Sequence, residues 1–96
     1  MRIKGTSDFA VKSPLGLDAA VEAVKRVLED FADRNPSVSA VQVEVVHSDE
    51  IRIEIVASGT YARLDDELDE LADRVSSALQ AGEATVSRGL TSLVPS

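Results

Sequence analysis

The sequence predicts an α+β fold, and three observations support this prediction. Apolar and polar residues alternate near both ends and in the middle of the chain, which is the period of a half-buried strand. Two intervening stretches repeat apolar residues every three or four positions, which is the period of an amphipathic helix. The 96 residues contain no linker-like segment, so we expect one domain with one core over residues 1–96.

The first strand is expected over residues 2–12. Ile3, Phe9 and Val11 share one parity, while positions of the other parity are mostly charged or polar. Gly5 and Ser7 weaken the middle of this pattern. The alternation therefore predicts a strand with one buried face.

The first helix is expected to follow Ser13 and Pro14, because the serine oxygen can cap a helix and the proline φ suits its first turn. Its apolar stripe consists of Leu17, Val21, Val24, Val27, Leu28 and Phe31. The pair Asn35 and Pro36 ends the helix, because proline disfavours a helical conformation in the residue before it.

A hairpin is expected from two adjacent runs of β-branched residues, 41–45 and 51–57, joined by a short polar stretch. Val45 and Ile51 must both face the core, and pairing them sets Glu44 opposite Arg52. A shift of two residues would set Glu44 against Glu54, which is a like-charge clash.

The second helix is expected to begin near residue 61 and to end at Gly82, a position where a left-handed C-cap residue is common. Its apolar stripe consists of Tyr61, Leu64, Leu68, Leu71, Val75, Ala78 and Leu79. A last strand begins at Ala84, but Gly89 disturbs its alternation, and the tail from about residue 90 is expected to fray.

This order of elements is the ferredoxin-like βαββαβ arrangement, in which two helices cover one face of an antiparallel sheet and leave the other face open. The centre of the core is expected to contain the residues on the apolar phase of each element. These residues are Val24, Leu28, Val43, Ile53, Leu68 and Leu71.

The composition limits the classes of function. A net charge of −7 disfavours nucleic acid or an anionic membrane as a partner and suits a basic one, whose binding should weaken as salt rises. The chain lacks cysteine, which excludes disulfides, thiolate nucleophiles and cysteine-ligated metals. No apolar run approaches membrane-spanning length and the first residues do not resemble a signal peptide, so we expect a cytoplasmic protein.

No catalytic, cofactor-binding or metal-binding residue is predicted. The acidic residues between Asp65 and Asp73 have the wrong spacing for a calcium loop and are interpreted as the solvated face of a helix. His47 is the only histidine, and it is interpreted as a turn residue because neighbours in a tight turn cannot assemble a catalytic triad.

The open face of the predicted sheet carries four cations, Arg2, Lys4, Lys12 and Arg52. They could hold a small anion. The same face also carries Asp8, Glu44 and Glu54, so pairing of opposite charges across strands is the favoured interpretation.

Two families resemble parts of the chain. The turn from Pro14 to Leu17 looks like the strand-to-helix turn of ACT-type regulatory domains, which share this topology and bind amino acids at subunit interfaces. The first strand, first helix and hairpin are similar to ribosome hibernation factors, a resemblance that implies basic helices and an extra strand, whereas these helices are acidic. Neither resemblance includes a family-specific motif, so no family is assigned.

The leading functional hypothesis is a non-enzymatic interaction or oligomerisation module. It rests on the absence of a nucleophile–base pair and on the open sheet face, where Val46 and Val56 offer apolar surface. The expected partner is a second copy, giving a homodimer, or another protein with a basic surface. The alternatives are an ACT-like domain that binds a small ligand at the Pro14–Leu17 turn, and a subunit of an enzyme with a shared site.

Overall fold

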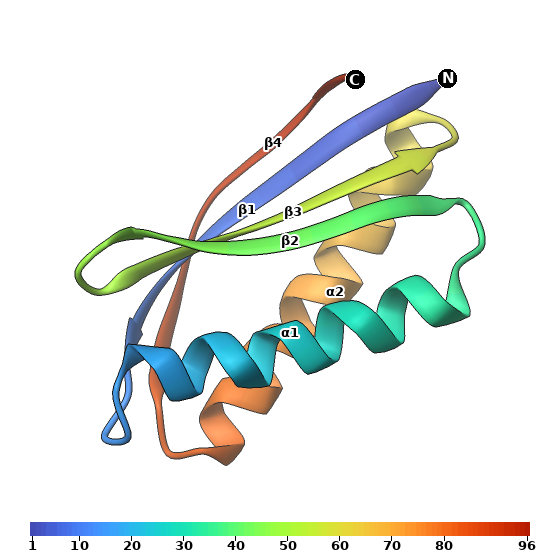
Figure 1. Ribbon diagram of the computed structural model, residues 1–96. Coiled ribbons are helices and arrows are strands. Elements are labelled where there is room, and N and C mark those ends of the chain that lie inside the picture. The colour runs from blue at the N-terminus through green and yellow to red at the C-terminus, as the bar shows by residue number, and fades with distance from the viewer.

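The computed structural model describes residues 1–96 and contains six elements in the predicted order. They are β1 (Arg2–Lys12), α1 (Leu17–Arg34), β2 (Val38–His47), β3 (Glu50–Ser58), α2 (Tyr61–Ala81) and β4 (Thr85–Pro95). The strands form one antiparallel sheet in the order β2-β3-β1-β4. Both helices cover the same face of this sheet, and the two termini lie side by side at one end (Figure 1). The predicted ferredoxin-like fold is confirmed.

The core lies between the helices and the odd-numbered side chains of β1 and β3. Its largest fully buried apolar side chains are Ile3, Phe9, Val24, Ile51, Ile53, Ile55, Leu64, Leu68, Leu71 and Val75. Five of the six residues expected at the centre of the core are buried. Val43 is only partly buried, because β2 is an edge strand and leaves that side chain at the margin.

The starts of the two helices differ in how they are capped. Ser13 Oγ accepts the N–H of Leu15 at 3.3 Å inside the preceding turn, and α1 begins only at Leu17, without a side-chain cap. The expectation that Ser13 caps this helix was wrong, because its hydroxyl accepts the N–H of Leu15, which lies before the first residue of the helix. At α2, Thr60 Oγ1 accepts the N–H of Arg63 at 3.2 Å, as an N-cap does.

The end of α2 also differs from the sequence prediction. Gly82 has a φ of −88°, and the left-handed residue is Glu83, with a φ of 65°. The N–H of Ala84 bonds to the carbonyl of Leu79, and the N–H of Glu83 bonds to that of Gln80. This is the Schellman pattern, moved one residue beyond the glycine, so a side-chain-bearing residue occupies the left-handed position.

The register of the β2–β3 hairpin is the one predicted. Val45 pairs with Ile51, and Glu44 pairs with Arg52. The hairpin turn projects past the start of α1 (Figure 1), and Val45 near its end is 49% exposed although it shares the parity of the core.

The last strand is longer and more ordered than the sequence predicts, because the expected frayed tail is paired with β1 as far as Pro95. Ser7 pairs with Thr91 but Phe9 pairs with Arg88, so two residues of β4, Gly89 and Leu90, lie opposite Asp8. This is a β-bulge. A Cβ at position 89 would lie 3.4 Å from the Asp8 carbonyl oxygen, an ordinary van der Waals contact, so the space beside Asp8 does not by itself require a glycine there. The bulge shifts the alternation by one residue, and pairing resumes beyond it.

Candidate interaction surface

The centre of the open sheet face is a set of paired charges. Arg52 donates two hydrogen bonds to the Asp8 carboxylate, at 2.7 and 3.1 Å, and Lys4 Nζ lies 3.3 Å from Glu54 Oε1. The hydrogen bonds to Asp8, and the charge of that carboxylate, raise the pKa of Arg52 above its ordinary value, so Arg52 remains cationic. Asp8 itself is only 8% exposed.

Pairing across strands therefore accounts for two of the four cations considered as an anion site. The other two, Arg2 and Lys12, form no ion pair but lie at opposite ends of β1 and cannot act on one small ion. The favoured interpretation of this face, mutual charge pairing, agrees with the geometry.

The acidic face of α2 is also engaged in ion pairs. Three pairs involve this helix through its acidic residues: Arg63 with Glu67, Arg74 with Glu70, and Arg88 of β4 with Asp69. Asp65, Asp66 and Asp73 are exposed on the surface of α2, which is a regular helix. The chain contains no group of three histidine or carboxylate side chains arranged to hold a metal ion.

His47 is the exposed last residue of β2, where it pairs with Glu50 of β3. His47 therefore lies at the end of the hairpin, directly before its turn. Ser48 beside it is exposed as well. The two side chains lie where nothing packs around them, so they do not form the enclosed geometry that a nucleophile and its base require.

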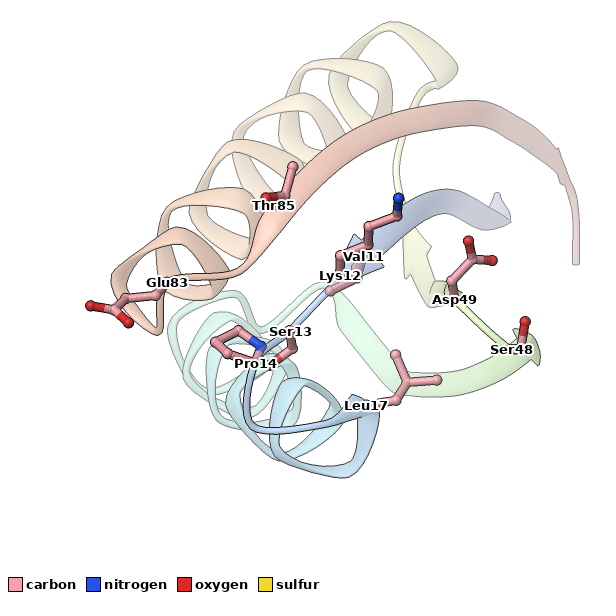
Figure 2. A pocket seen from close by; sticks show the side chains of 9 residues that line it. All are labelled: Val11, Lys12, Ser13, Pro14, Leu17, Ser48, Asp49, Glu83 and Thr85. Carbon is pink, nitrogen blue, oxygen red and sulfur yellow. The ribbon is translucent and has the colours of Figure 1, made fainter.

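A shallow depression of about 710 Å³ lies at the Pro14–Leu17 turn, between the end of β1, the hairpin turn and the start of β4. Its charged lining residues are Lys12, Asp49 and Glu83. They form no ion pairs with one another, and Figure 2 shows the Glu83 carboxylate pointing outward, away from the other lining residues. The carbonyl of Asp49 accepts the N–H of Val11 at 2.7 Å, which holds the hairpin turn against the end of β1. The depression thus has polar groups that do not converge, unlike most ligand sites.

The outer edge of β4 is the most open surface of the sheet. Leu90 is 82% exposed and Val94 is 44% exposed, and both project from the open face. Arg88 is the only charged residue of this strand. Natural proteins usually protect a long edge strand with charges or an interior proline, and here the bulge at Gly89 is the main interruption.

The direction of the β4 amide groups follows from one hydrogen bond. The N–H of Ser96 donates to the carbonyl of Arg2 at 3.0 Å. Alternate residues of an antiparallel strand bond to the same neighbour, so Ser92 and Val94 also direct their amide groups toward β1. Thr91 and Leu93 then direct theirs outward, and Pro95, which has no N–H, occupies an outward position where no donor is lost.

The opposite edge, β2, is less available. Its register shifts twice, at Ser39 and at Val46, and each shift interrupts a regular row of donors and acceptors. Ser39 Oγ donates to the carbonyl of Val56 at 3.1 Å, and Val41 and Val43 pack against the core beneath α1. Of the two edges, β4 beyond its bulge therefore presents the more regular row of unpaired backbone groups.

Of the two valines expected on the open face, Val56 lies there, because it pairs with Lys4, but it is only partly exposed. Val46 lies at the register shift near the far end of β2, away from Val56. The exposed apolar residues of the open face are Leu90 and Val94. The available sequence signal was their spacing of four residues just after Gly89, in a segment interpreted as a fraying tail.

Other solved structures share this fold, although no protein-family model and no curated protein matches the sequence. A C-terminal segment of the alpha subunit of aIF2 from Pyrococcus abyssi superposes with a TM-score of 0.75 at 17% identity, over 91% of this chain and 49% of that one. In the intact aIF2 alpha subunit the matched part is 34% of the chain, at a TM-score of 0.78 and 16% identity over 94% of this chain. This chain thus spans a half or a third of those proteins.

Two further structures have quite different descriptions. A de novo designed protein with a ferredoxin fold gives a TM-score of 0.63 at 18% identity, over 93% of this chain and 83% of that one. SnoaB, a cofactor-independent oxygenase from Streptomyces nogalater, gives 0.57 at 17% identity, over 99% and 92% of the two chains. These comparisons show the fold alone.

Neither helix has the combination of length and apolar character needed to cross a membrane. Both helices have one apolar face against the sheet and one charged face in solvent, which is the pattern of a helix at a protein surface.

Proposed function

We propose that this protein is a non-enzymatic association module that binds a partner chain through the outer edge of β4. The observation that carries the proposal is a long edge strand with outward amide groups at Thr91 and Leu93, one charged residue, and two exposed apolar side chains. Strand addition to such an edge uses backbone hydrogen bonds for affinity and the alternate side chains for selectivity.

The distribution of charge supports association over catalysis. The charges at the centre of the open face are paired, Asp8 with Arg52 and Lys4 with Glu54, and the hydrogen bonds to Asp8 raise the pKa of Arg52 above its ordinary value. Catalytic sites usually bring together groups whose pKa values are shifted toward the working pH, whereas a paired arginine has a structural role.

Sedimentation velocity over micromolar to millimolar concentrations tests this proposal. We expect the wild-type chain to associate, and we expect Leu90→Asp to abolish the association, because the substitution places a carboxylate on the edge strand. Leu15→Asp is the matched control, since Leu15 is 75% exposed but lies in the turn before α1. Its association should equal that of the wild type.

Two results would overturn the proposal. The first is a chain that stays monomeric at every concentration. The second is an oligomer whose dissociation constant changes equally with Leu90→Asp and Leu15→Asp, because association would then not take place through the outer edge of β4.

A second candidate function is the ACT-like binding of a small ligand, and the depression at the Pro14–Leu17 turn favours it. A ligand that binds the folded state raises the melting temperature, and the rise grows with the logarithm of the ligand concentration above the dissociation constant. A thermal-shift screen with amino acids and small anions, in which Lys12→Glu changes a charged lining residue of the depression, separates this candidate from association through β4.

A further inference from the structure

We infer that the partner is a second copy of this chain, and that two β4 strands pair antiparallel about a two-fold axis at Ser92. This inference rests on the proposed function of the β4 edge. It would join two four-stranded sheets into one continuous sheet of eight strands.

The backbone is self-complementary in this register. With Ser92 on the axis, the outward-directed Thr91 lies opposite Leu93 of the second copy, and Leu93 lies opposite its Thr91. Residues that both point outward form a mutually hydrogen-bonded pair in an antiparallel ladder. Each of these two pairs therefore contributes two hydrogen bonds. Ser92 faces its own symmetry mate in the close, non-hydrogen-bonded position between them.

The exposed side chains select this register among its neighbours. Leu90 and Val94 lie on the same face of β4, and the axis at Ser92 sets Leu90 directly opposite Val94 of the second copy. A shift by two residues in either direction would instead set Leu90 opposite Ser92 or Ser96 of that copy. Only the proposed register buries the two apolar residues against each other on both sides of the axis.

The charge and the shape of the molecule permit this approach. In a chain with a net charge of −7, β4 contains no acidic residue, so no carboxylate of one β4 strand meets a carboxylate of the other. α2 crosses the sheet diagonally, beginning behind the end of β3 and ending near the start of β4 (Figure 1). In the second half of β4, Leu93 packs against the core, whereas Thr91, Ser92 and Val94 are exposed.

Single-cysteine variants test the register, because the natural chain contains no cysteine. Cα atoms in a non-hydrogen-bonded antiparallel pair are about 4.5 Å apart, which lies within the range that a disulfide spans. In a glutathione redox buffer, where only juxtaposed thiols stay oxidised, Ser92→Cys is expected to convert to a disulfide-linked dimer of doubled mass. Ser87→Cys, exposed on the same strand and face but beyond the paired segment, should remain monomeric after denaturation.

A mixing experiment tests the same register independently. Leu90→Cys alone and Val94→Cys alone should form little disulfide, whereas an equimolar mixture should yield a mixed dimer, identified by its mass. Equal cross-linking of Ser87→Cys and Ser92→Cys would overturn the inference, as would the absence of a mixed dimer. If sedimentation still shows an oligomer sensitive to Leu90→Asp, the association function stands and only the two-fold register is wrong.

Discussion

Leu68→Ala is expected to lower the free energy of unfolding by about 2–5 kcal/mol, which is the range for truncating a fully buried leucine. Leu68 is completely buried between α2 and the sheet, in the main core cluster. Its Cδ2 lies 3.3 Å from where a Cβ at Gly5 would be, so the side chain reaches the backbone of β1. Removing it leaves a cavity that a well-packed core cannot fully collapse.

Urea denaturation followed by circular dichroism measures this loss. Leu15→Ala is the matched control, since it removes the same atoms from a side chain that is 75% exposed and lies outside β4. We expect the control to change the free energy by no more than about 0.5 kcal/mol. Equal denaturation midpoints for the two variants would contradict the burial of Leu68.

Gly5→Val is expected to destabilise the fold by about 1–3 kcal/mol, the usual cost of overpacking a core. Strand propensity alone predicts the opposite, because valine suits a strand far better than glycine. The structure decides between these effects. A Cβ at this position would lie 3.1 Å from Leu93 Cδ2, 3.3 Å from Leu68 Cδ2 and 3.5 Å from Ile55 Cγ1, before the two methyl groups are added.

Ala10→Val provides the comparison, because Ala10 is exposed on the same strand. At this exposed position the strand propensity of valine should act without overpacking. The melting temperature of Ala10→Val should therefore equal or slightly exceed that of the wild type. A Gly5→Val variant that melts above the wild type would show that Leu68 and Leu93 move aside at little cost.

Much of this fold can be read from the sequence because burial on one face leaves a regular pattern. The helix stripes and the β-branched hairpin predict both the element order and the pairing of Glu44 with Arg52. The charges of Asp8, Arg52, Lys4 and Glu54 fall on one parity, so their pairing is also foreseeable.

The end of the chain is where pattern reasoning fails. The bulge opposite Asp8 reverses the alternation of β4, so its two halves have opposite parity and neither alone resembles a long strand. The shift of the left-handed residue from Gly82 to Glu83 depends on which carbonyls of α2 are bonded, a detail that local propensity does not encode. Leu90 and Val94 can be recognised as an exposed pair only when the whole of β4 is known to be a strand.

The candidate surface was missed for a related reason. An edge strand has a neighbouring strand on one side only. Which strands lie at the edges depends on the order of strands in the sheet, and no local segment of the sequence shows that order. The sequence pattern draws attention to Val46 and Val56, because they lie in or beside segments with clear strand patterns. The edge strand with exposed apolar side chains is β4.

The most direct test of β4 as the association surface is the salt dependence of the dissociation constant of the dimer, measured by sedimentation equilibrium. Each copy carries a net charge of −7, and the proposed contact is backbone and apolar with no acidic residue on the strand. Screening shortens the range of repulsion from about 10 Å at 0.1 M salt to about 3 Å at 1 M. We therefore predict that added sodium chloride tightens the dimer. A dissociation constant that rises with salt would contradict this account, because attractive charges would then have to lie at the interface.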